Sequence, residues 1–179
     1  MAAKQELAEH IRTIPDFPVP GVQFRDVTTL FAHPPAFQAA VDAMIAPYRG
    51  VELKAIAGMD ARGFIIGGAM SYQMSLPFVP IRKKGKLPYR TIAEAYSLEY
   101  GEAIVEIHED AVGPGERVLL VDDLLATGGT ATAGVKLLRR LQAEVVAAVF
   151  LVNLPDLGGE KRLQALDVDV MSLCAFDGD

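Results

Sequence analysis

The stretch VLLVDDLLATGGT at residues 118–130 decides the fold class. Its first four residues are apolar and predict a buried strand, and two adjacent carboxylates, Asp122 and Asp123, follow at the carboxyl end of that strand. Small and hydroxylated residues then lead into a predicted helix. A strand that passes through a glycine pair into a helix is typical of α/β proteins, in which ligands bind beyond the carboxyl ends of the strands.

The loop in this stretch has the composition of an anion-binding site. Gly128 and Gly129 allow the backbone to approach a phosphate closely, and the hydroxyls of Thr127 and Thr130 add donors to the amides at the helix start. No lysine follows the glycine pair, as a Walker A loop requires, and the Gly-x-Gly-x-x-Gly pattern of dinucleotide-binding folds does not follow the strand. The ordered sequence of strand, carboxylates and Thr-Gly-Gly-Thr favours a phosphate cradle over a plain turn.

Asp122 and Asp123 need a partner other than the phosphate, because carboxylates repel it. A sugar diol, or Mg²⁺ held together with the substrate, would supply that partner. The stretch therefore predicts a ligand that carries both a phosphate and a sugar.

On both sides of this stretch, strands and helices alternate. Strands are predicted at residues 53–58, 76–81, 117–123, 145–153 and 168–174, and helices at 36–48, 63–74 and 130–142. Residues 96–100 and 103–108 flank Gly101 and predict a hairpin. The first 14 residues predict a helix, which the prolines of IPDFPVPG end. The pattern indicates one α/β domain over residues 1–179, with a mostly parallel central sheet flanked by helices.

Composition and charge exclude several classes of protein. The 179 residues carry a net charge of −6, which argues against binding nucleic acid in bulk, and a DNA-binding regulator would need a basic helix-turn-helix segment that is absent. No apolar run is long enough for a membrane helix, and the polar N-terminus lacks the apolar core of a secretory signal. Cys174 is the single cysteine and lies in an apolar run, so it predicts a buried thiol. These features favour a cytoplasmic protein that contacts neither membrane nor nucleic acid.

A second strand, at 53–58, runs into the loop GMDARG at residues 58–63. The free amides at the following helix start and the guanidinium of Arg62 form a plausible second anion site. A turn with a surface arginine is the alternative, and the spacing alone does not decide between them. Two anion loops at two strand ends would suit a substrate with phosphate at one end and pyrophosphate at the other.

Four cations lie within the five residues 82–86, which read RKKGK. This cluster is either a solvated surface or a local positive field for a small anionic ligand in an acidic protein. A polar stretch follows as far as Glu94, and a long loop of this kind is either disordered or an active-site lid. As a lid, it would be mobile without ligand and ordered with both substrates, and its lysines could neutralise a departing pyrophosphate.

The stretch VLLVDDLLATGGTATAG resembles the phosphoribosyl-pyrophosphate motif of the type I phosphoribosyltransferases. Four further segments, PDFPVPGVQFRDVTTLF, GMDARGF, RKKGKLP and YSLEYG, are similar to the adenine-specific members of that family. The resemblance implies the type I phosphoribosyltransferase fold with a flexible lid loop, and usually a homodimer. The implied activity is purine salvage, in which adenine and phosphoribosyl pyrophosphate (PRPP) give AMP and pyrophosphate. Mg²⁺ is the implied cofactor, carried by PRPP near Asp122 and Asp123 rather than bound by the protein directly.

The resemblance also assigns roles to residues. Asp122 and Asp123 hold the ribose hydroxyls, and the 5′-phosphate is cradled by Ala126, Thr127, Gly128, Gly129 and Thr130. The pyrophosphate is met by Asp60, Ala61 and Arg62, often through a non-proline cis peptide, and by Lys83 and Lys86 of the lid and hairpin segment 82–108. Glu99 becomes the candidate general acid or base at N7 of adenine, with Arg62 and Tyr100 as the other catalytic candidates. By its position alone, Glu99 reads as a solvent-facing strand residue.

The N-terminal segment 1–34 is implied to recognise the base. Backbone groups of Val22 to Arg25 would read the polar edge of adenine, and Phe24 and Leu124 would stack on its two faces. From the residues alone, Gly21 indicates a turn and Phe24 could equally be a core aromatic. A site of this kind would reject guanine, whose exocyclic oxygen would face an acceptor. Hypoxanthine, guanine or xanthine as the base is the nearest alternative function.

Overall fold

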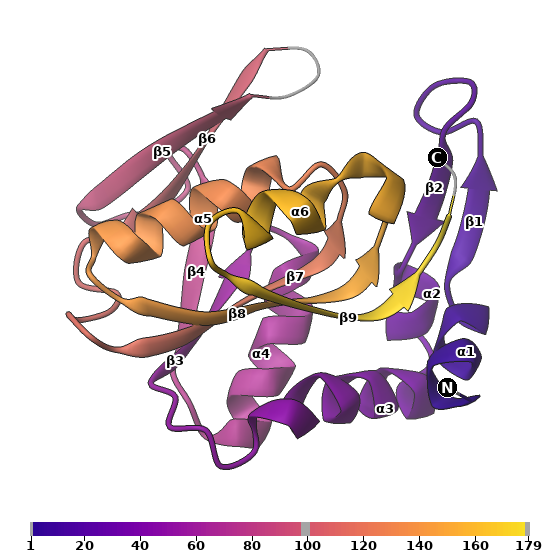
Figure 1. Ribbon diagram of the computed structural model, residues 1–179, viewed down its shortest axis with the longest axis horizontal. Helices are drawn as coiled ribbons and strands as arrows, with labels where there is room; N and C mark the ends of the chain where they lie inside the picture. The colour runs from indigo at the N-terminus through magenta and orange to yellow at the C-terminus, as the bar shows by residue number, and fades with distance from the viewer. Residues whose placement is uncertain (1, 98–100, 178–179) are drawn as a thin grey trace.

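The computed structural model describes residues 2–97 and 101–177 (Figure 1). The helices are α1 Ala2–Glu9, α2 Thr28–Phe31, α3 Pro34–Ile45, α4 Arg62–Met74, α5 Gly129–Arg140 and α6 Gly159–Gln164, with 3₁₀ turns at Ala46–Tyr48 and Pro155–Leu157. The strands are β1 Arg12–Pro15, β2 Gln23–Asp26, β3 Ala55–Met59, β4 Phe78–Lys83, β5 Thr91–Ser97, β6 Glu102–His108, β7 Arg117–Leu125, β8 Glu144–Asn153 and β9 Asp169–Ala175.

Seven strands form the central sheet in the order β5-β6-β4-β3-β7-β8-β9. The pairs from β4 through β9 along this order are parallel, while β6 pairs antiparallel with both β4 and β5. From β3 the chain crosses to β4 on one side, and from β7 it crosses to β8 and β9 on the other. The crevice between the carboxyl ends of β3 and β7 is therefore the point at which the strand order reverses, where open α/β sheets bind ligands.

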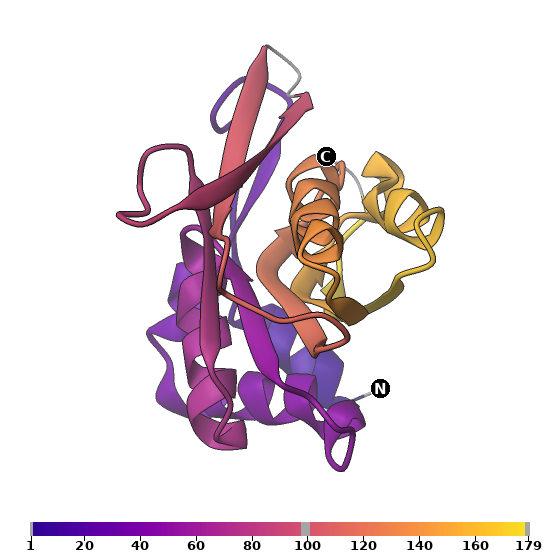
Figure 2. The same ribbon diagram turned by 90° about the vertical axis from the view of Figure 1, so that its left-hand side faces the viewer.

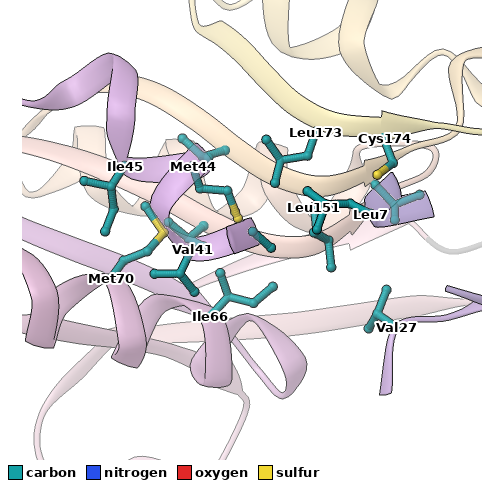
Figure 3. Close-up of a cluster of buried hydrophobic side chains, with 14 of the residues drawn as sticks. Leu7, Val27, Val41, Met44, Ile45, Ile66, Met70, Leu151, Leu173 and Cys174 are labelled. Atoms are coloured by element: carbon teal, nitrogen blue, oxygen red, sulfur yellow. The ribbon is translucent and has the colours of Figure 1, made fainter. Parts of the chain in front are cut away.

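Helices cover both faces of this sheet, as Figure 2 shows with α4 and α5 on opposite sides. On the face of α3 and α4, the core contains side chains such as Met44, Ile66 and Leu151 (Figure 3). On the face of α5 and α6, fully buried residues include Leu120 and Phe150. Because β7 and β8 are buried on both faces, their sequences are nearly continuous apolar runs. The predicted mostly parallel α/β fold is confirmed.

The structure also contains two antiparallel hairpins. The pair β1–β2 forms a separate two-stranded sheet, and β5–β6 extends the edge of the central sheet. In Figure 1 both hairpins extend toward the same side of the molecule, and the segment after β9 approaches β2, where Arg25 covers the Phe176 ring. The hairpin that was predicted around Gly101 is thus confirmed.

Two boundaries differ from the sequence prediction. The predicted helix over the first 14 residues is wrong, because α1 ends at Glu9 and residues 12–15 pair with β2. The predicted loop as far as Glu94 is also wrong, because residues 91–97 form β5 along the full length of β6. The loop between β4 and β5 is therefore only residues 84–90. In both places an antiparallel partner supplies hydrogen bonds that local composition does not reveal.

Candidate active site

The carboxyl end of β7 and the start of α5 enclose a pocket of about 90 Å³, lined by Asp122 and by residues 124–131. Gly128 is the helix N-cap and has a left-handed backbone, with φ of 76°. The first intrahelical bond runs from the amide of Thr132 to the carbonyl of Gly128 at 2.9 Å. The amides that precede Thr132 in the first turn have no carbonyl four residues back within the helix, so they are available to an anion in the pocket. The loop geometry thus suits the predicted phosphate cradle.

Asp123 and Asp122 sit in different electrostatic settings at this strand end. The carboxylate of Asp123 is 7 % exposed and accepts a hydrogen bond from Nε of Arg62 at 2.6 Å. Asp122 accepts the amide hydrogen of Asp123 at 2.9 Å. The pKa of Asp122 is raised well above its ordinary value, first because burial removes water from its carboxylate and second because negative Asp123 lies beside it.

The loop after β3 lies next to the loop after β7, because these two strands are neighbours in the sheet. It contains the cis peptide bond between Asp60 and Ala61, and Arg62 then begins α4. Arg62 is 42 % exposed, so its guanidinium reaches solvent while Nε holds Asp123. The structure therefore brings the two predicted anion loops together through one ion pair between residues 61 positions apart.

Arg82 ties the loop after β3 to the basic segment. Its Nε donates to Asp60 at 3.0 Å, and its Nη1 donates to the carbonyl oxygen of Lys86 at 3.2 Å. The side chains of Lys83, Lys84 and Lys86 are exposed. The Arg82 side chain therefore links the loop after β3 to the turn after β4. The three lysines, at the end of β4 and in that turn, face solvent. The sequence identified the cationic cluster but not this division of roles.

The β5–β6 hairpin is held by two acidic residues, Glu106 and Glu94, to which the sequence motifs assigned no role. Glu106 is 7 % exposed and accepts the amide hydrogen of Gly85 at 2.9 Å. Glu94 on β5 pairs with Lys136 at 3.0 Å and with Arg140 at 3.5 Å, both on α5. A glutamate within the apolar run AIVEIH was the available signal for Glu106, since a buried carboxylate needs a partner. Glu94 gave no comparable signal, because its partners lie on a distant helix.

The proposed base-recognition segment forms the β1–β2 hairpin. Asp26 accepts hydrogen bonds from Arg12 at 2.5 Å and from the amide and hydroxyl of Thr28. These bonds lower the pKa of Asp26 to about 2, because they stabilise its charged form. The Phe24 ring contacts Phe17 edge to face, with 5.1 Å between centroids. Because the Phe24 ring also lies 5.9 Å from the guanidinium of Arg62, the hairpin reaches the loop after β3.

The other residues predicted to bind the base contact other parts of the protein. The Arg25 guanidinium bonds the Thr13 hydroxyl at 2.6 Å and covers the Phe176 ring at 4.5 Å, so its side chain faces the C-terminal segment. The Val22 amide already donates to the carbonyl of Val19 at 3.3 Å. Reading adenine through this amide would require that long bond to open. Leu124 lines the phosphate pocket and packs against the core.

Glu99 and Tyr100 lie outside the described residues, so their predicted catalytic roles stay predictions. Among residues 2–97 and 101–177, no group of three or more His, Cys, Asp and Glu side chains is arranged to hold a metal ion. Within the same ranges, the helices are too short or too polar to cross a membrane.

The fold and the paired anion loops define a phosphoribosyltransferase, and residues 26–174 match the family model described as a phosphoribosyl transferase domain. An adenine phosphoribosyltransferase of Dinoroseobacter shibae is 61 % identical over 179 residues, which are 100 % of both chains. The chain therefore belongs to the phosphoribosyltransferase family, among the adenine phosphoribosyltransferases.

Solved structures agree with this assignment. The adenine phosphoribosyltransferase of Rhodothermus marinus superposes with a TM-score of 0.92 at 46 % identity, covering 98 % of this chain and 99 % of the other. The Saccharomyces cerevisiae enzyme, in complex with D-2,5-dideoxy-2,5-imino-altritol 1,6-bisphosphate and adenine, has a TM-score of 0.90 at 34 % identity, covering 96 % and 98 %. The fold is thus the type I phosphoribosyltransferase fold.

Proposed function

We propose that the protein transfers the phosphoribosyl group of PRPP to adenine, giving AMP and pyrophosphate, in a reaction that requires Mg²⁺. The observation that carries this proposal is the junction of two anion loops at neighbouring strand ends through Arg62 and Asp123. A ligand with phosphate at one end and pyrophosphate at the other would span the two loops. The bisphosphate and adenine bound by the yeast relative support the same pair of substrates.

In this reaction N9 of adenine forms a bond to the anomeric carbon of the ribose, and the bond from that carbon to the pyrophosphate oxygen breaks. Adenine gives up a proton, and we assign Glu99 to handle it at N7. The sequence contains no motif that indicates an activated nucleophile of the Ser-His or Cys-His kind. Direct displacement through a cation-like sugar is therefore favoured, with catalysis by positioning and charge stabilisation.

The residues around the site divide the charge of the substrate among them. Asp122 and Asp123 would accept the ribose hydroxyls, and the amides of residues 126–130 would hold the 5′-phosphate. The exposed part of the Arg62 guanidinium and the free ends of Lys83 and Lys86 would offset the charge of the departing pyrophosphate.

Mg²⁺ fits this site as a companion of the substrate. Two adjacent carboxylates at one strand end can meet an ion already coordinated by pyrophosphate, which is how Mg²⁺ is usually bound beside substrate phosphates. When bound, the ion would supply positive charge to the leaving pyrophosphate. Asp123 already accepts a hydrogen bond from Arg62, so we propose that Mg²⁺ is held by the substrate rather than by these carboxylates.

The test is an absorbance assay of adenine, guanine, hypoxanthine and xanthine with PRPP, each with Mg²⁺ and with the ion chelated. We expect AMP formation from adenine only when Mg²⁺ is present. Comparable turnover of guanine or hypoxanthine would show that residues 22–25 do not select adenine. Turnover of adenine in the presence of chelator would show that the reaction does not require Mg²⁺.

We also propose that the protein is a cytoplasmic homodimer. The family resemblance implies a dimer, and on α4 the side chains of Tyr72 and Ile65 are 90 % and 49 % exposed. Sedimentation equilibrium should give twice the 19.2 kDa mass of the chain. A species with the mass of one chain at micromolar concentration would contradict the dimer.

A further inference from the structure

The backbone of Gly159, the first residue of α6, lies directly against the phosphate loop. Its amide donates to the carbonyl oxygen of Ala126 at 3.1 Å, and the amide of Leu154 donates to that of Leu125 at 2.9 Å. Gly159 is buried, and the residues that line the phosphate pocket are all between 122 and 131. The segment 154–159 therefore contacts the loop from outside the pocket.

There is no room for a side chain at this contact. A Cβ atom on Gly159 would lie 2.9 Å from the amide nitrogen of Gly128 and 2.9 Å from Cδ1 of Leu125, and closer still to the carbonyl oxygen of Ala126. The approach is reciprocal, since a Cβ atom on Gly128 would lie 2.9 Å from Cα of Gly159. Two of the atoms that would clash with a Gly159 side chain are backbone atoms of the loop itself, so the loop would have to move.

The opposite side of the contact is held in place. Asn153 at the end of β8 is 3 % exposed, and its Nδ2 donates to the carboxylate of Glu160 at 2.8 Å. Within α6 itself, Gln164 donates to the other oxygen of that carboxylate at 3.3 Å and so orients it toward Asn153. Because the start of α6 is anchored through Glu160, a clash at Gly159 would displace the loop rather than the helix.

We propose that Gly159 is a positioning residue for the binding of the 5′-phosphate of PRPP and of AMP. This inference rests on the proposed function of the loop at residues 126–130. Gly159 sets the position of the Ala126 carbonyl and the Gly128 amide, and hence the direction in which the following amides point. A shift of a few tenths of an ångström in such a loop weakens several charge-assisted hydrogen bonds together.

The chain contains a matched control one residue earlier. Gly158 has a left-handed backbone with φ of 74°, and a Cβ atom placed on it would meet nothing within 4 Å. Gly158→Ala therefore strains the backbone without pressing on the loop. Gly159→Ala has the opposite effect: alanine is compatible with the helical backbone there, and its methyl group presses on the loop.

The experiment measures dissociation constants for ribose 5-phosphate and for adenine, together with KM for PRPP and the thermal midpoint. For Gly159→Ala we expect about tenfold or more loss of ribose 5-phosphate affinity and a parallel rise in the KM for PRPP. Its adenine affinity should stay within about twofold of the original, since that ligand carries no phosphate. For Gly158→Ala we expect a lower thermal midpoint with unchanged affinity for ribose 5-phosphate.

Folded Gly159→Ala protein with unchanged ribose 5-phosphate affinity would overturn the inference, as would equal losses for both ligands. If Gly159→Ala does not fold, Glu160→Ala provides a second test, because it removes the bond to Asn153. This variant should lower the affinity for ribose 5-phosphate by about twofold to fivefold and leave the affinity for adenine unchanged. If the two affinities do not differ in this way, the inference is overturned. Failure of the original protein to convert adenine would refute the proposed function, while the ribose 5-phosphate measurements would still decide the role of Gly159.

Discussion

Two neighbouring residues at the end of β7, Asp122 and Asp123, have carboxylates in different electrostatic environments. Asp123 accepts a hydrogen bond from Nε of Arg62. Asp122, next to it, has a raised pKa because it is buried and lies beside negative Asp123. The two adjacent carboxylates therefore lie in different environments, because Asp123 accepts a hydrogen bond from a cation and Asp122 accepts one from a backbone amide.

Replacing either carboxylate by an amide should weaken the binding of PRPP. Asp123→Asn and Asp122→Asn keep the side-chain size but change an acceptor pair into a mixed donor and acceptor. A charge-assisted hydrogen bond contributes about 1.5–3 kcal/mol. We expect this loss mainly as a raised KM for PRPP, because contacts to ribose hydroxyls exist in the ground state as well. Steady-state kinetics at saturating Mg²⁺ check it, and an unchanged KM in both variants would contradict it.

The raised pKa of Asp122 predicts a specific dependence of stability on pH. Since the folded protein binds this proton more tightly than the unfolded chain does, the free energy of unfolding should fall as pH rises above the ordinary aspartate range, about pH 4. Asp122→Asn cannot lose a proton and should remove this part of the decline. Urea titrations of both proteins at a series of pH values measure the difference. Parallel curves across pH 4–8 would show that burial does not perturb Asp122.

Glu99 should affect turnover rather than binding. If it handles the adenine proton, Glu99→Gln should lower kcat by about 10²-fold or more with little change in either KM. Glu102, an exposed residue at the start of β6, provides the matched control. Glu102→Gln should leave kcat unchanged. Near-normal turnover of Glu99→Gln would return Glu99 to the solvent-facing strand residue that its position alone suggests.

The sequence singled out candidate site residues, but it did not reveal which residues they contact. Asp122, Asp123 and the 126–130 loop stand in one contiguous motif, so their grouping was readable from the chain. The bond between Arg62 and Asp123 joins two loops and depends on β3 and β7 being neighbours, which no local pattern encodes. The same limit explains why the role of Arg82 was missed.

Among the secondary-structure elements, those with strong periodicity were predicted and the short ones were not. The strands β3, β7 and β8 and the helix α5 are long or apolar enough to be recognised from composition. The helix α6 has six residues and was not predicted, although its first residue fixes the phosphate loop. Short elements of this kind are determined by tertiary contacts, so local propensity carries little information about them.

The β5–β6 hairpin and its preceding turn should respond differently to ligands. Hydrogen bonds to β6 and the ion pairs of Glu94 already hold residues 91–97 in the free protein. The turn at residues 84–90 is mostly exposed and carries Lys86, while Lys83, the other lysine proposed to meet pyrophosphate, directly precedes it at the end of β4. We therefore expect hydrogen exchange at residues 86–90 to slow in an equilibrium mixture of substrates and products, while exchange along β5 changes little. Equally slow exchange of residues 86–90 in the free and ligated protein would rule out a lid there.

For the whole molecule, the order of the sheet explains why one site draws on distant parts of the chain. The segment around β3 and α4 supplies the loop proposed to bind pyrophosphate, and the segment from β7 to α6 supplies the loop proposed to bind the 5′-phosphate, together with the backbone that packs behind it. The N-terminal hairpin closes on this junction through Phe24 and Arg62. None of these three parts contains the complete site, so binding competence requires all of them to be assembled.

The exposed lysines on the 84–90 turn and its flanks have a consequence for the kinetics of encounter. The molecule carries a net charge of −6, which on average repels an anion such as PRPP. Lys83, Lys84 and Lys86 nevertheless face solvent beside the anion loops, and fields are screened beyond about 10 Å at 0.1 M salt. The association rate should therefore follow the local field and fall as ionic strength rises, which stopped-flow binding of PRPP in increasing sodium chloride would measure. A rate that increased with salt would mean that an approaching substrate senses the whole acidic surface and not this turn.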